Sequence, residues 1–154
     1  MKEVQLFQLL QSQIYEFWHI YLIRVDPLTK LLHYHSFSDQ VVQLAQQSQP
    51  LELDIHALLF SVFLAAVNSL SNDEAILRLK ERGDVLRTRF TKGMQAALGR
   101  AEARRQPTTR VLQAVTLYVV SVRMFWELVD FSDRLIGAAR FVYTGRKVLT
   151  NRCS

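Results

Sequence analysis

The chain has 154 residues, of which 49% are hydrophobic and 21% are charged, and its formal net charge is +5. This length suits one domain with a core of its own, and this composition excludes an intrinsically disordered protein. The lone cysteine, Cys153, excludes a disulfide framework and favours a reducing intracellular compartment.

The N-terminal part of the chain predicts a long helix that ends at a proline corner. Apolar residues at spacings of three and four predict this helix over residues 4–23. The pair Asp26-Pro27 ends it, because the residue before a proline is pushed out of the α region. Residues 28–33 then form a short helical turn or an ordered connector. The N-terminal residues 1–13 lack the basic start and apolar run of a secretory signal, so we expect neither export nor a membrane anchor.

A second helix follows the corner and leads to a polar loop. Ser36 or Ser38 caps this helix, which runs to about Gln47. The loop that comes next, residues 46–50, is rich in glutamine and ends in a proline.

Residues 54–70 are apolar nearly all the way round. A helix without a polar face must be surrounded by other helices or by lipid. This stretch is shorter than the roughly 20 apolar residues that span a bilayer, and it contains His56 and Asn68. We therefore predict the buried central helix of a soluble helical domain, with the Asp54 carboxylate as its N-cap.

Two more helices follow the central one. Ser71, Asn72 or Asp73 starts a short helix that stops at Gly83, where glycine takes the left-handed position after the helix end. Asp84 starts the clearest amphipathic helix of the chain, with basic residues outside its apolar stripe. That stripe consists of Leu86, Phe90, Met94, Ala97, Leu98 and Ala101.

The C-terminal part contains a second strongly apolar stretch. A break with a new N-cap at Thr108 or Thr109 precedes residues 111–126, which we predict to form a second buried helix packed against the first. A last helix covers about 132–143, and residues 144–154 form a disordered basic tail. The predicted fold class is all-α, an irregular bundle of six to seven helices around two buried apolar helices.

Charge is distributed unevenly along the chain. Residues 1–72 contain three basic and six acidic side chains, whereas the remaining 82 residues contain 16 basic and eight acidic ones. A basic half can indicate an acidic partner such as nucleic acid, or simply a solvated helix face. We favour the solvated face, because no aromatic residues alternate with these charges to form a stacking platform for bases.

The residue pattern predicts neither a metal site nor an enzyme. The four histidines, one cysteine and their spacing do not form a structural zinc pattern. The predicted tail around Cys153 offers no partner to lower the pKa of its thiol. Since the chain also has no glycine-rich phosphate loop and no nucleophile elbow, we expect no catalytic residues, no cofactor and no metal. The histidines are His19, His33, His35 and His56.

Several segments together resemble the fungal-specific transcription factor domain, the middle homology region of zinc binuclear cluster regulators. The matching segments are IYLIRVDPLTKLLHYHSF at 20–37, ALLFSVFLAAVNSLSNDEA at 57–75, LRTRF at 86–90 and LQAVTLYVVSVR at 112–123. They occur in the order in which that family has them. The resemblance implies an all-α regulatory fold over residues 1–143, without catalytic residues.

The departures from the family are as informative as the matches. The six-cysteine cluster that ligates zinc and reads DNA in those regulators is absent, so the resemblance implies no sequence-specific DNA binding by this chain. Beyond Arg123 only a faint trace of the family pattern remains, in residues 126–140. We therefore expect a partial domain whose core is uncovered on one side, and an exposed apolar patch of that kind predicts self-association or a partner.

The family box is interpreted as a rigid corner rather than a binding site. Pro27 fixes the backbone, while Leu28, Leu31 and Leu32 fill the bundle and Thr29 and Lys30 stay at its surface. The residues of the box are Asp26, Pro27, Leu28, Thr29, Lys30 and His33.

The resulting hypothesis is a nuclear transcription regulator that acts through a protein partner, either itself or a related transcription factor, and that controls a metabolic or secondary-metabolite pathway. An alternative is a small helical accessory protein of a biosynthetic pathway, which binds a ligand between the two buried helices. A third possibility is a degenerate fragment without a function of its own.

Overall fold

The computed structural model describes residues 9–103 and 108–127. The chain divides into two compact units, one ending at Val122 and one beginning at Arg123. The described residues contain seven helices and no strand, which confirms the predicted all-α fold. The helix expected at 132–143 and the tail that follows it lie outside this part of the chain.

The first helix and the corner after it differ in detail from the prediction. Helix α1 covers Gln11–Arg24 and helix α2 covers Asp26–Thr29. The break between them falls at Val25, so Asp26 is helical and is not pushed out of the α region as expected. Pro27 is instead accommodated in the first turn of α2, where a helix requires no intrahelical partner for the missing N–H.

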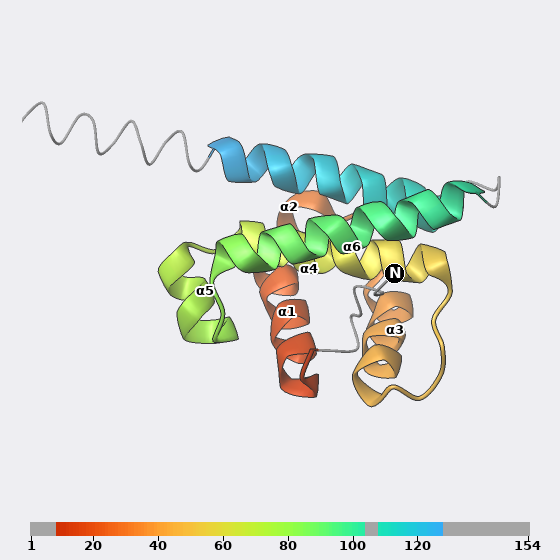
Figure 1. Cartoon of the computed structure of the whole chain (residues 1–154), viewed down its shortest axis with the longest axis horizontal. Helices are drawn as coiled ribbons and strands as arrows, with labels where there is room; N and C mark the ends of the chain where they lie inside the picture. Colours follow the sequence, from red (N-terminus) through yellow and green to blue (C-terminus); the bar gives the residue numbers. More distant parts are fainter. Residues whose placement is uncertain (1–8, 104–107, 128–154) are drawn as a thin grey trace, which may run out of the picture. The chain divides into compact units, whose positions relative to one another are not determined.

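Helix α3 (Tyr34–Gln46) begins earlier than either predicted serine cap. Its N-cap is His33, and no side chain caps it. Tertiary packing explains the early start, because the Trp18 ring lies 6.2 Å from the Tyr34 ring and 5.3 Å from the Phe37 ring. These contacts on the first turn stabilise a helix that lacks a cap. Figure 1 shows α1 and α3 side by side, both crossing α4 steeply.

Helix α4 (Leu53–Asn68) is the buried central helix that the sequence predicts. Thirteen of its 16 residues are buried, so its surface is covered on every side. Its N-cap is Glu52, whereas Asp54 lies in the first turn, where its carboxylate accepts a hydrogen bond from the Ile55 N–H at 2.8 Å. The prediction of an Asp54 cap was therefore wrong by two residues.

No single described helix has the length and hydropathy to cross a membrane. Helices α4 and α5 (Asn72–Leu79) reach the threshold only as a pair, and that pair is bent by 120°.

Three phenylalanine rings join α1, α4 and α6 (Gly83–Ala103) at the centre of the core. The Phe17 ring lies 5.1 Å from the Phe63 ring in a stacked arrangement and 5.2 Å from the Phe90 ring in an edge-on one. Such pairs stabilise a core by about 1 kcal/mol beyond the burial of their area. The apolar stripe predicted for α6 is confirmed, since Leu86, Phe90 and Met94 are each 1% exposed.

Helix α5 starts as predicted but ends differently. Its N-cap is Ser71, which accepts a hydrogen bond from the Glu74 N–H, while the Glu74 carboxylate accepts one from the Ser71 N–H. At the other end Lys80, not Gly83, takes the left-handed conformation, with φ of 60°. The Lys80 ammonium donates to the Leu77 carbonyl at 2.9 Å, which satisfies an acceptor at the helix end. Gly83 is instead the first residue of α6.

Helices α4 and α6 pack closely against each other at Gly93. They run antiparallel, because Phe90 of α6 lies beside Phe63 of α4 while Gly93 lies beside Phe60. A Cβ atom at position 93 would come within 2.4 Å of the Phe60 ring, so only glycine fits here without movement. Figure 1 shows the two helices side by side along their lengths.

Replacing Gly93 by alanine will destabilise the fold despite the better helix propensity of alanine. The buried Phe60 ring must move, and overpacking of this kind costs roughly 1–3 kcal/mol. Gly99 is the matched control, since it lies on the same helix with no atom within 4 Å of its added Cβ. Gly99→Ala is expected to stabilise by about 1 kcal/mol. Urea denaturation compares the two variants, and equal effects would contradict the close packing at Phe60.

Candidate interaction surface

The last described helix covers residues 109–127, and its portion up to Val122 belongs to the first unit. One face of that portion is buried, at Ala114, Leu117 and Ser121. The opposite face is exposed, so this is not the fully buried second helix that the sequence predicts. Although most residues from 111 to 122 are apolar, this helix buries only one of its faces.

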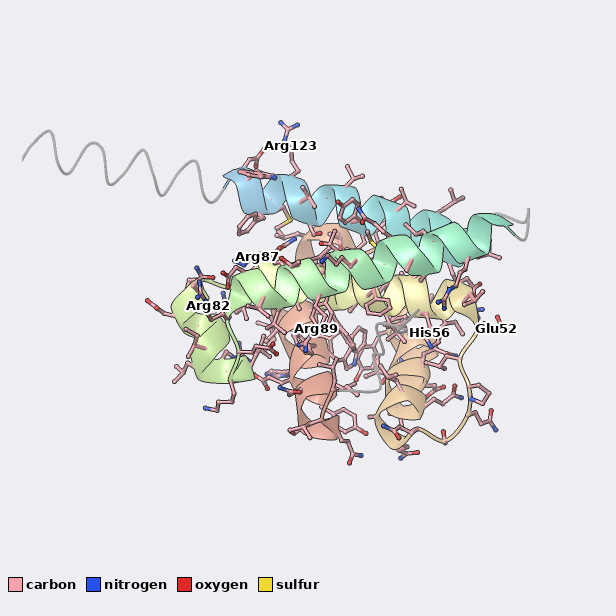
Figure 2. The ribbon with its side chains drawn as sticks, in the orientation of Figure 1. Glu52, His56, Arg82, Arg87, Arg89 and Arg123 are labelled. Atoms are coloured by element: carbon pink, nitrogen blue, oxygen red, sulfur yellow. The ribbon has the colours of Figure 1, made fainter. Side chains whose placement is uncertain are left out.

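A polar cluster at the N-terminal end holds this helix against α4. The Thr108 hydroxyl donates to the Asp54 carboxylate at 3.0 Å and accepts from the Val111 N–H at 3.3 Å, which confirms the N-cap predicted at this break. Arg110 pairs with Glu52 at 3.2 Å and with Asp54 at 3.5 Å. Figure 2 shows Glu52 at the start of α4, where this cluster forms.

Two further polar contacts continue along the same helix. The Gln113 amide donates to the Leu31 carbonyl at 2.9 Å, and the Asn68 amide donates to the Ser121 hydroxyl at 3.5 Å. Because Thr108 lies beside Asp54 and Ser121 lies beside Asn68, the portion of the helix up to Val122 runs parallel to α4. Its inner face is thus fixed in position at both ends.

The outer face of residues 111–122 carries three exposed apolar side chains together with the exposed Thr116. Leu112 is 61% exposed, Val115 is 41% exposed and Val119 is 58% exposed. No charged residue occurs between Arg110 and Arg123. We call Leu112, Val115 and Val119 the outer stripe, and this uncharged face is what the arrangement offers to a partner.

The family box supports the helix that carries the outer stripe. Its corner is closed by Lys30, whose left-handed backbone has φ of 46° and whose ammonium donates to the Asp26 carboxylate at 3.0 Å. The Thr29 hydroxyl donates to the Val25 carbonyl at 3.2 Å. Leu31, which follows directly, supplies the carbonyl that Gln113 binds.

The leucines of the box behave differently from one another. Leu31 and Leu32 pack against the core as predicted, but Leu28 is 70% exposed and fills nothing. It lies on the outward side of the single turn of α2. His33, the last residue of the box, is exposed and donates no side-chain cap to α3. The box lies at the corner in the backbone between α1 and α3, where α2 forms its single turn.

Arginine side chains of the basic half are used in ion pairs within the fold. Arg78 pairs with Glu16 of α1 at 2.7 Å, and Arg89 pairs with Glu81 at 2.7 Å. Arg82 pairs with Asp84 at 2.8 Å. Figure 2 shows Arg82 near the junction of α5 and α6, and Arg89 on α6. Three basic side chains of this half are therefore used in contacts within the fold.

A charged cluster also joins α1 to α5. The Arg24 guanidinium donates to the Glu74 carboxylate at 2.7 Å and to the Ser69 carbonyl at 2.9 Å. These Arg24 hydrogen bonds, together with the Ser71 N–H, lower the pKa of Glu74 from 4.5 to about 2. Glu74 therefore caps α5 and binds α1 with the same carboxylate.

The histidines and acidic residues do not assemble into a metal centre in the part of the chain that the structure describes. No group of three or more potential ligands lies together there. His19, His33 and His35 are exposed, and His56 is partly buried on α4.

The described part of the chain is a helical module with an exposed apolar stripe, and comparison with known proteins identifies its relatives. The chain is 34% identical over 112 residues to a pyriculol/pyriculariol biosynthesis cluster transcription factor of Pyricularia oryzae, covering 73% of this chain and 15% of the relative. It is 29% identical over 127 residues to the aurofusarin cluster transcription factor aurR2 of Gibberella zeae, covering 79% and 19% respectively. It is 30% identical over 130 residues to the transcriptional regulator nsrM of Aspergillus novofumigatus, covering 84% and 18%.

The chain is thus homologous to fungal cluster-specific transcription factors over most of its length. These named relatives are transcription regulators rather than enzymes. The chain spans less than one fifth of the length of each of them. No family model matches the sequence, and no solved structure matches it.

Replacing Thr108 by valine will destabilise the attachment of helix 109–122. The variant loses both the N-cap and the hydrogen bond to Asp54, at a cost of about 1–2 kcal/mol. Thr109→Val is the matched control, because Thr109 is exposed and one residue further along. Thermal unfolding followed by circular dichroism measures both variants. If Thr108→Val and Thr109→Val have the same melting temperature, the polar cluster at Asp54 does not hold the helix in place.

The Arg24–Glu74 pair predicts a pH dependence of stability. The Glu74 carboxylate has a lower pKa in the folded state than in the unfolded chain, so its contribution is complete above pH 4.5 and is lost as the pH falls toward 2. Its side chain is 40% exposed, which reduces the contribution to about 1 kcal/mol after solvent screening.

Glu74→Gln is therefore expected to lower the free energy of unfolding at pH 7 by about 1 kcal/mol, with the difference from the unmodified chain shrinking as the pH is lowered. Asp39→Asn, at an exposed position of α3, serves as the control. Denaturation curves between pH 7 and pH 3 test this, and a difference that stays constant over that range would refute the linkage.

Proposed function

We propose that this chain is a regulatory module of transcription that acts in the nucleus and influences the genes of a secondary-metabolite cluster. The observation that carries this proposal is the similarity of most of the chain to two cluster transcription factors and to a third transcriptional regulator, each from a different fungus. The all-helical fold, with an exposed apolar face and no assembled metal centre in its described part, is consistent with a module that binds protein.

The module acts through a protein partner, which is a second copy of itself or a related transcription factor. It does not read a DNA sequence on its own. Support for this comes from the ion pairs, since Arg78, Arg89 and Arg110 are each bound to a carboxylate. Phosphate contacts require lysine or arginine side chains that can exchange their counterions for DNA. We also propose that the chain has no catalytic activity and requires no cofactor.

The direct test is genetic. Deletion of the gene, and separately its overexpression, should change transcript levels of a biosynthetic cluster by severalfold in the fungus that carries it. RNA sequencing of the two strains against the parent measures this, and nuclear fluorescence of a tagged copy tests the location. Unchanged transcripts in both strains would rule out a regulatory role and favour an accessory protein of the pathway, or a fragment without function.

A further inference from the structure

We infer that helix 109–122 is a detachable cover of α4, which opens as a unit while α1 to α6 stay folded. The starting observation is the placement of polar side chains on α4. Apart from His56, the polar residues of this helix are Asp54, Ser61 and Asn68, at intervals of seven residues. Seven residues complete almost two helical turns, so these three side chains share one face. We call them the polar stripe of α4.

The polar stripe faces helix 109–122. Asp54 accepts the hydrogen bond of Thr108 at 3.0 Å, and Asn68 donates to Ser121 at 3.5 Å. Ser61 lies midway between Asp54 and Asn68 on the same face, so it lies along the same contact. The polar groups of an otherwise apolar helix are thus gathered under one of its covers.

The apolar contribution of this cover is small. Helix 109–122 buries Ala114 and Leu117, and Tyr118 packs partly against the core. Because the free energy of burial grows roughly with the apolar area removed from water, helix 109–122 is attached more weakly than α6. The apolar residues that α6 buries are more numerous and mostly larger, namely Leu86, Phe90, Met94, Ala97 and Ala101.

Buried polar groups weaken the attachment further. The described residues contain three buried polar side chains, Ser61, Asn68 and Ser121, and all three lie along this contact. The Asn68 Oδ1 atom is buried and has no hydrogen-bond partner in the described part of the chain. A buried acceptor without a partner costs free energy, which is recovered when the contact opens and water binds it. The hydroxyls of Ser61 and Ser121 donate to carbonyls of their own helices and not across the contact.

The polar contacts at the start of the helix can also be exchanged for water. The side chain of Arg110 is 45% exposed and that of Glu52 is 74% exposed, so their ion pair contributes little to stability. The Thr108 hydroxyl and the Asp54 carboxylate both regain hydrogen bonds to water on opening, which limits the net contribution of their bond. These contacts position the closed helix without binding it strongly.

A region with few buried apolar contacts opens at a lower free energy than the whole fold. In the open form the outer stripe leaves the fold and the polar stripe of α4 becomes accessible. The module therefore offers different surfaces in its two forms, and a partner that binds one form more tightly shifts the balance between them. This device does not depend on the proposed role in transcription.

The experiment is native-state hydrogen exchange of the purified full chain, followed by mass spectrometry or NMR at low urea concentrations. We expect the amides of residues 114–121 to be protected about tenfold less, or weaker still, than those of residues 58–67 at the centre of α4. Their protection should also depend less on urea, because opening of one helix exposes less surface than unfolding of the whole chain.

Gly99→Ala separates opening of the cover from unfolding of the whole chain. Gly99 lies at an exposed position of α6, which stays folded whether the cover is closed or open. The alanine favours the helix over the unfolded chain, so the protection of residues 58–67 should rise about fivefold. The protection of residues 114–121 should stay unchanged.

Asn68→Leu tests the cause of the weak attachment. It removes the unpartnered oxygen and keeps the branched shape of the side chain, so the protection of residues 114–121 should rise about tenfold. Asn68→Val is a smaller second variant in case leucine does not fit, and its protection should rise as well. Ser61→Ala is the matched control on the same stripe, because the Ser61 hydroxyl is already bonded within α4.

Equal protection of residues 114–121 and 58–67 would overturn the inference. So would a Gly99→Ala variant in which both stretches gain protection by the same factor, since the helix would then open only when the whole chain unfolds. If neither Asn68 variant raises the protection of residues 114–121, the polar stripe does not weaken the cover. All of these outcomes are measured on the purified chain, so they are separate from the transcript changes that test the proposed function.

Discussion

The burial of α4 on every side is the constraint on which the rest of the described fold depends. A 16-residue helix with 13 buried positions cannot be stable alone in water, so other helices must cover each of its faces. Helix α6 covers one face by the close approach at Gly93, and α1 covers another through Phe17. Helix 109–122 covers a third, through Leu117 and Ser121. The remaining helices then occupy the positions that these three leave.

Ion pairs between residues that are far apart in the sequence join helices of the described fold. Arg78 reaches Glu16 across 62 residues of sequence, Arg110 reaches Glu52 across 58, and Arg24 reaches Glu74 across 50. In two of these pairs a cation of the basic half meets a carboxylate of the acidic half. Each exposed pair contributes little to stability, but together they specify which helix ends meet. The excess of basic side chains after residue 72 is thus explained in part by ion pairs within the molecule.

Local sequence patterns predicted those features that local physics determines. The burial of α4, the cap at Ser71 and the apolar stripe of α6 all follow from periodicity or from a single side chain near a helix end. The failures occurred where distant contacts decide the outcome. The early start of α3 depends on Trp18, which lies on another helix. No window of neighbouring residues contains this information.

The largest error, at residues 111–122, is also the most informative one. This stretch and α4 have a similar composition, because both are mostly apolar and nearly uncharged. The hydrophobic pattern therefore predicts burial for both. Such a pattern indicates that other groups must pack against several faces of the helix. It does not indicate whether those groups belong to the same chain or to another molecule. For α4 the described fold supplies nearly all of this packing, whereas Leu112, Val115 and Val119 remain 61%, 41% and 58% exposed. An uncharged face that the sequence prepares for burial, and that the described fold leaves open, is where a partner contributes most to stability.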